Sequence, residues 1–140
     1  MYDRILVPVD SSAPSDRAVL AARDLALLSK GEVWVLHLRE LREVGGKGGV
    51  AVPFESSEDA KAEVETSLKV LTEAGVTAHG EVRGTIFGYA AKEIVADAKE
   101  IGADVIVMGS RGRGNLAGLV LGSTAHKVIH LTDRPVLVIR

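Results

Sequence analysis

The chain has 140 residues, of which 46% are hydrophobic and 26% charged, a composition typical of one globular domain. Its net charge of −2 lacks the basic surplus that nucleic-acid binding uses, and no apolar run approaches the roughly 20 residues that span a bilayer. The absence of cysteine excludes disulfides, thiolate metal sites and cysteine nucleophiles. We therefore expect a cytoplasmic protein that binds neither nucleic acid nor membrane.

Apolar, β-rich segments recur along the whole chain. The five strands that we expect lie at residues 4–9, 32–38, 77–82, 104–108 and 135–139. Three of them consist almost entirely of Val, Ile and Leu, which is typical of parallel strands covered by helices on both faces.

Helical patterns alternate with these strands. The helices that we expect lie at residues 15–29, 57–74 and 90–101, with a fourth starting near Ser123. Gly31, Gly75 and Gly102 follow the first three and are predicted to end them. The alternation predicts an α/β fold with a single-domain, open, parallel five-stranded sheet, right-handed crossovers and helices on both faces.

One segment, residues 40–56, fits neither pattern. It contains GGKGG at positions 45–49 and then Pro53. No helix follows the glycines directly and no Gly-Lys-Ser/Thr sequence is present, so we interpret the segment as a flexible surface loop or lid rather than a phosphate loop.

The connection from Gly109 to Gly122 carries the main functional signal. Ligands of such sheets bind beyond the carboxyl ends of the strands, and this connection is about twice the usual length of 2–6 residues. Its glycines can adopt positive φ and let backbone amides approach an anion, while Gly122-Ser123-Thr124 opens the last helix. These features predict a phosphate site. A Walker A loop is excluded because no lysine follows Gly122, and a dinucleotide fingerprint because no glycine-rich turn follows the first strand.

The spacing of these glycines also matches the motif G-x2-G-x9-G-[ST], met by Gly109, Gly112, Gly122 and Ser123. Together with YDRILVPVDSS, WVLHL, ADVIVMGSRGRG, LVLGSTAHKVI and RPVLVIR, it makes residues 1–140 resemble the ATP-binding subgroup of the universal stress protein family. The resemblance implies a Rossmann-like, doubly wound sheet of strand order 3-2-1-4-5, bound ATP, homodimers and a role in stress responses.

The resemblance also implies which residues would bind the nucleotide and its Mg²⁺, the metal being held mainly by the phosphates. They are six beside the adenosine (Pro8, Val9, Asp10, Leu38, Met108 and Gly109) and six beside the phosphates (Ser110, Arg111, Gly112, Gly122, Ser123 and Thr124).

Several of these residues have a simpler interpretation as well. Asp10 could cap the first helix instead of contacting a ligand, and Arg111 and Arg113 could be solvated loop charges instead of phosphate ligands. His126 stands where the family often has an acidic residue, which places a titratable group near the expected phosphates. We interpret His37 and His79 as structural polar groups.

The predicted function is that of a nucleotide-dependent stress-response module with little or no catalysis. Phosphoryl transfer needs metal ligands and a group that positions the nucleophile as well as a cation, and only the cation is found here, so fast catalysis is not expected. A slow ATPase or an autophosphorylating phosphotransferase is the first alternative. An interaction domain that binds no nucleotide is the second. The apolar strand at 135–139 is expected to be a sheet edge that pairs with a second copy, and the downstream protein partner is unknown.

Overall fold

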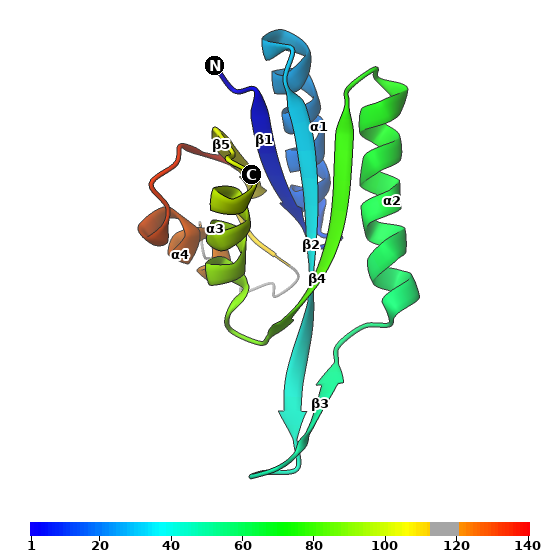
Figure 1. The fold of residues 1–140 in the computed structure, drawn as a ribbon, viewed down its shortest axis with the longest axis vertical. Coiled ribbons are helices and arrows are strands. Elements are labelled where there is room, and N and C mark those ends of the chain that lie inside the picture. The colour runs from blue at the N-terminus through cyan, green and yellow to red at the C-terminus, as the bar shows by residue number, and fades with distance from the viewer. Residues whose placement is uncertain (113–120) are drawn as a thin grey trace.

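A mostly parallel sheet with helices on both faces forms the body of the protein in the computed structural model, which describes residues 1–112 and 121–140 (Figure 1). In chain order the elements are β1 Arg4–Val9, α1 Ala13–Ser29, β2 Glu32–Val44, β3 Val50–Pro53, α2 Ser57–Glu73, β4 Ala78–Ile86, α3 Ala90–Glu100, β5 Val105–Gly109, α4 Ser123–Leu131 and β6 Val136–Ile139. None of the described helices combines the length and the apolar character that crossing a membrane requires.

The parallel strands confirm the predicted order. β1 pairs with β2 and β5, β2 pairs with β4 on its far side, and β5 pairs with β6, all in parallel. The order β4-β2-β1-β5-β6 is therefore the expected 3-2-1-4-5 once β3 is set aside. The strand order reverses at β1: β2 and then β4 are added on one side of it, and β5 and β6 on the other. This reversal point is where α/β sheets bind ligands.

The segment predicted as a surface loop is instead a β-hairpin, and the prediction for residues 40–56 is wrong in that respect. β2 continues to Val44, and β3 pairs with it antiparallel from Leu41 opposite Pro53 to Val44 opposite Val50. Gly45, Gly46 and Gly48 turn the chain with positive φ. The resulting hairpin projects beyond the rest of the sheet (Figure 1) and raises the number of described strands to six.

The core has one layer on each face of the sheet, because successive strand residues point in opposite directions. Ile5, Val7 and Val35 pack with α1 and α2, while Leu6, Leu36 and Ile106 pack with α3 and α4. Both faces of the central strands are thus buried, which explains why they contain almost no polar residues.

The helix ends are set by local hydrogen bonds. The Ser12 and Ser56 hydroxyls accept from the amides of Ser15 and Asp59 and so cap α1 and α2. The predicted role of Gly31 is wrong: Lys30 adopts the left-handed conformation that ends α1, with φ of 59°. Gly31 is needed for space instead, since a Cβ there would lie 2.3 Å from the Tyr2 carbonyl oxygen.

Candidate functional site

A cavity of about 510 Å³ opens at the carboxyl ends of β1 and β5, beside the middle of β2. That volume lies within the range of small-molecule sites, about 300–1,000 Å³. All of the binding residues implied by the resemblance line it: Pro8, Val9, Asp10, Leu38, Met108, Gly109, Ser110, Arg111, Gly112, Gly122, Ser123 and Thr124. The structure thus brings together residues that lie more than a hundred positions apart in the sequence.

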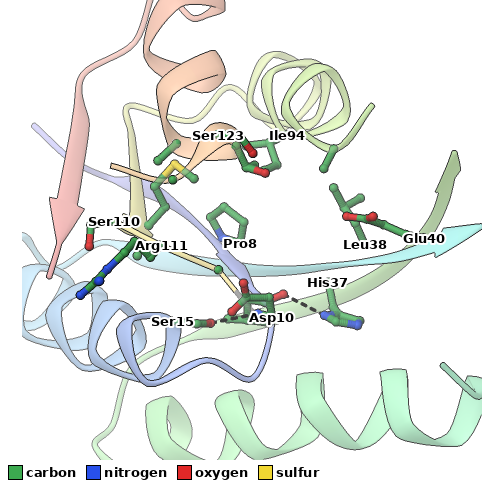
Figure 2. Close-up of a pocket in the computed structure, with 18 of the residues that line it drawn as sticks. Pro8, Asp10, Ser15, His37, Leu38, Glu40, Ile94, Ser110, Arg111 and Ser123 are labelled. Atoms are coloured by element: carbon green, nitrogen blue, oxygen red, sulfur yellow. Dashed lines mark hydrogen bonds between the residues drawn. The ribbon is translucent and has the colours of Figure 1, made fainter. Parts of the chain in front are cut away.

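The cavity has two chemically different ends (Figure 2). Ser110 and Arg111 lie at one end, near the start of α4, and Leu38 and Glu40 lie at the other, on β2. The lining carboxylates Glu40 and Glu55 therefore stand away from the positive end of the α4 dipole. An elongated anion would be attracted to the α4 end and repelled from the β2 end.

The first turn of α4 presents backbone donors to the cavity. Gly122 is the N-cap and offers no side chain, and His126 N–H is the first amide of this helix to bond back, to the Gly122 carbonyl at 3.0 Å. Within residues 1–112 and 121–140, the amides of Ser123, Thr124 and Ala125 have no acceptor. These three N–H groups, together with the Ser123 and Thr124 hydroxyls, could donate to a bound oxyanion. The Gly122 amide is not among them, because it donates to the Ser110 carbonyl at 2.6 Å.

The motif glycines are required by close packing. Gly109, Gly112 and Gly122 do not adopt positive φ, contrary to the expectation from the sequence. A Cβ at Gly109 would lie 2.9 Å from backbone and side-chain atoms of Pro14, and one at Gly112 would lie 2.7 Å from Asp10 Oδ2. Their role is to let the end of β5 lie against the start of α1. Gly114 and Gly118 lie outside the described residues.

Asp10 organises the turn between β1 and α1. Its Oδ1 accepts from the Ser12 amide at 3.0 Å and from the Ser12 hydroxyl at 2.5 Å, and its amide donates to Ser15 Oγ at 3.0 Å. Ser12, not Asp10, caps α1. The capping interpretation of Asp10 is therefore wrong, and Asp10 lines the cavity beside Gly112.

The arginine expected beside the phosphates has its backbone in the site and its charge elsewhere. The Arg111 carbonyl accepts a long hydrogen bond, 3.5 Å, from Ser12 Oγ. Its guanidinium points away from the cavity centre, toward α1 (Figure 2). Arg113, the other candidate, lies outside the described residues.

The histidines have structural partners. His37 is buried at the cavity wall, with Nδ1 donating to the Val9 carbonyl at 2.8 Å and Nε2 facing the Glu55 carboxylate. His79 bonds Glu32 and stacks on Trp34, with ring centroids 4.5 Å apart. Both match their interpretation as structural polar groups. His126 is exposed and packs against His130 instead of lining the cavity.

Sequence reasoning missed part of the wall. The further lining residues are Ser15, His37, Glu40, Phe54, Glu55, Phe87, Ala90, Ile94 and Ala125. Phe54 and Glu55 reach the cavity only because the hairpin returns the chain to it. The signal was available, since glycines between the alternating residues of 41–44 and 50–53 are typical of a hairpin.

The sheet order and the cavity at its reversal point define a doubly wound α/β domain in which the N-terminus of α4 faces the cavity. A model of the universal stress protein family matches residues 1–140, and the chain belongs to that family. It is 37% identical to the universal stress protein YxiE of Bacillus subtilis, over the full length of both chains.

Two relatives from archaea share the fold. The universal stress protein MJ0577 of Methanocaldococcus jannaschii is 31% identical over 100% of this chain and 96% of its own. The solved structure of MJ0577 superposes with a TM-score of 0.81 over 99% of this chain and 96% of that one. A universal stress protein from Archaeoglobus fulgidus, solved in complex with dAMP, superposes with a TM-score of 0.72 over 99% of this chain and 98% of that one at 24% identity.

Proposed function

We propose that this chain is a cytoplasmic, ATP-binding regulatory module of the stress response with little or no catalytic activity. The observation that carries the proposal is the single cavity that joins three open amides at the start of α4 to an apolar wall on β2 and α3. A ligand with an anionic tail and an apolar ring system fits both ends of that cavity.

The phosphates would lie at the α4 end. Amides of a first helical turn that have no protein acceptor are good anion donors, and the helix dipole adds a favourable field. Ser123 and Thr124 add hydroxyl groups beside these amides. Mg²⁺ would be held mainly by the phosphates themselves.

The adenosine would extend toward β2. Pro8 and Leu38 provide apolar contacts there, and Asp10 provides a carboxylate for a ribose hydroxyl. The dAMP complex of the Archaeoglobus fulgidus protein concerns that protein, and at 24% identity its likeness to this chain extends to the fold alone. The case for an adenine nucleotide here therefore rests on this chain's own residues and its membership of the family.

Weak catalysis follows from the side chains in the cavity. Phosphoryl transfer needs a group that positions the nucleophile and a cation on the developing charge. The Asp10 carboxylate is engaged by Ser12, and the Arg111 guanidinium is directed away. We expect nucleotide binding to act through a change in the protein surface, read by a protein partner, rather than through turnover.

We further propose that the protein is a homodimer joined through β6. This strand ends the sheet and pairs only with β5 among the described strands. Leu137 at its centre is 42% exposed, although the strand is apolar throughout. An exposed, apolar strand edge invites pairing with its own copy about a two-fold axis.

The nucleotide content of the purified protein tests the proposal. Freshly purified protein is denatured, and the supernatant is chromatographed for adenine nucleotides. We expect ATP from the wild type and none from Gly122→Val, because a Cβ at position 122 already lies 3.2 Å from the Ser110 carbonyl oxygen and Arg111 Cα, and the valine methyl groups would enter the anion site.

Gly84→Val is the matched control, since a Cβ at position 84 meets nothing within 4 Å. This variant should retain as much ATP as the wild type. Loss of ATP in both variants, or no ATP in any of the proteins and no binding on titration, would contradict the proposal. Phosphate release from added ATP over hours would favour the slow ATPase instead.

A further inference from the structure

Two exposed phenylalanine rings meet at the cavity, at the end away from α4. Phe54, between β3 and α2, is 52% exposed, and Phe87, between β4 and α3, is 64% exposed. Both line the cavity, and their ring centroids lie 5.6 Å apart at an interplanar angle of 48°. Neither residue belongs to the glycine motif or to the binding residues that the family resemblance implies.

Backbone hydrogen bonds fix both residues to β2. Phe54 N–H donates to the Glu40 carbonyl at 3.0 Å, and Phe87 N–H donates to the Leu41 carbonyl at 2.8 Å. Leu41 is opposite Pro53 on β3 and also opposite Ile86 on β4, so β3 and β4 flank opposite edges of β2. The two rings therefore approach each other across β2 from its two sides, each held by a strand end.

The position of these rings calls for a ligand. Exposing aromatic surface to water is unfavourable in free energy. Apolar side chains that cluster at a cavity and are surrounded by polar groups are typical of binding sites. Arg42, further along the hairpin, places its guanidinium carbon 5.4 Å from the centre of the Phe54 ring, and this cation–π contact helps to hold the ring in place.

The surrounding wall suits a flat aromatic ring. Leu38 lies at this end of the cavity beside Glu40, and Ala90 and Ile94 add further aliphatic groups to the cavity lining. Because the two phenyl rings are tilted relative to each other, one can stack on the face of a nucleotide base while the other meets its edge, the two arrangements that aromatic pairs prefer.

We propose that Phe54 and Phe87 hold the base of the bound nucleotide by aromatic contact. The β2–β3 hairpin is then part of the binding site, since it brings Phe54 to the cavity. This inference rests on the proposed function and adds to it the residues that recognise the aromatic half of the ligand.

Calorimetric titration with ATP tests the assignment on wild type, Phe54→Ala and Phe87→Ala, each first freed of bound nucleotide. Stacking of one base on one aromatic side chain corresponds to roughly a tenfold change in affinity, so each variant should bind ATP about tenfold more weakly. Tyr89→Ala is the matched control, because Tyr89 is 50% exposed in the same turn but does not line the cavity. It should bind ATP like the wild type.

Nuclear Overhauser effects give a second, direct measurement. We expect contacts between the adenine H2 or H8 protons and the ring protons of Phe54 or Phe87 in the wild-type complex. Weaker binding without any such contact would mean that the substitutions act indirectly, and it would overturn the assignment. Unchanged thermal unfolding confirms that the variants are folded.

The outcomes separate this inference from the proposed function. If the wild type binds ATP, Gly122→Val does not, and both phenylalanine variants keep wild-type affinity, the aromatic assignment is wrong and the proposed function stands. If the wild type binds no ATP, both are wrong.

Discussion

Gly109, Gly112 and Gly122 belong to one motif but face different neighbours. A Cβ at Gly109 would contact the backbone of α1, one at Gly112 would contact the Asp10 carboxylate, and one at Gly122 would contact the backbone at Ser110. The motif therefore encodes the packing of β5 against the start of α1 and the close approach of Gly122 to the backbone at Ser110 and Arg111. Sequence reasoning could identify these positions, but it assigned them the wrong physical reason, because a close approach between distant segments leaves no trace in local spacing.

Gly109→Ala should destabilise the fold. The new methyl group would lie 2.9 Å from Pro14 atoms and 3.0 Å from the Ser15 amide nitrogen, and these backbone atoms cannot move independently. We expect a loss of about 1–3 kcal/mol in the free energy of unfolding, measured by urea denaturation. Gly84→Ala, with open space around the Cβ, should stay close to the wild type. Equal stability of the two variants would refute this account of Gly109.

Asp97 on α3 predicts a pH dependence of stability. It is 2% exposed, Arg83 Nη2 lies 3.0 Å from its Oδ1, and the pair is not aligned as a hydrogen bond. Burial raises the pKa of Asp97 above 3.8, and Arg83 opposes that rise. The folded state therefore binds the Asp97 proton more tightly than the unfolded state does. The stability that this proton contributes is fully present below pH 3.8, the unfolded pKa, and is lost as the pH rises through the higher pKa of the folded state.

Asp97→Asn should remove the loss of stability that accompanies ionisation of Asp97 at higher pH. Arg83 keeps Glu81 and Glu100 as partners, at 2.6 and 2.8 Å. At pH 7 we expect the variant to match or exceed the wild-type free energy of unfolding by up to about 1 kcal/mol, since replacing a buried ion pair is often neutral or stabilising. The difference should shrink toward pH 4. A variant that is clearly less stable at pH 7 would show that the ion pair is net favourable.

At the scale of elements, the parallel strands and the helices were predictable because each is encoded locally. Continuous apolar runs mark the buried strands, and serine before each of α1 and α2 marks a helix start. β3 was missed because it is short, mostly exposed and preceded by glycines, features that a loop shares. The extension of β4 to Ile86 was missed as well, because residues 83–86 form no continuous apolar run and are held in the sheet by pairing with residues 38–41 of β2.

The cap of α1 offers a test at this scale. Ser12 Oγ accepts from the Ser15 amide at 3.2 Å, and Ser12→Ala removes that acceptor. We expect a loss of about 1 kcal/mol in the free energy of unfolding. Ser57→Ala is the control, because Ser57 follows the cap of α2, is exposed and makes no capping bond. Chemical denaturation should show a lower free energy of unfolding for Ser12→Ala and an unchanged one for Ser57→Ala.

At the scale of the whole molecule, the topology places the site. Parallel strands direct their carboxyl ends to one edge of the sheet, and the reversal of strand order at β1 separates α1 from α4 there. The position of the cavity could therefore be predicted once the chain was recognised as an alternating α/β sequence. Its extent was not predicted, because the outer wall includes Phe54 and Glu55, which reach the cavity only through the hairpin that was interpreted as a loop.

The proposed dimer is also a property of the whole molecule. Leu137→Asp would place a charge at the centre of the β6 edge, where pairing with a second copy would bury it. Sedimentation velocity should give a two-chain mass for the wild type and a one-chain mass for the variant, since an unpaired buried charge is strongly unfavourable. A wild type that stays monomeric at high concentration would exclude the dimer.

The central claim is that the open amides of α4 hold the phosphates of a nucleotide. It is tested most directly by adding ATP to ¹⁵N-labelled protein freed of nucleotide and following the backbone amide resonances. The account predicts saturable shifts that are largest at Ser123, Thr124 and Ala125 and absent in Gly122→Val. Saturable binding of ATP that leaves these three amides unmoved would contradict it.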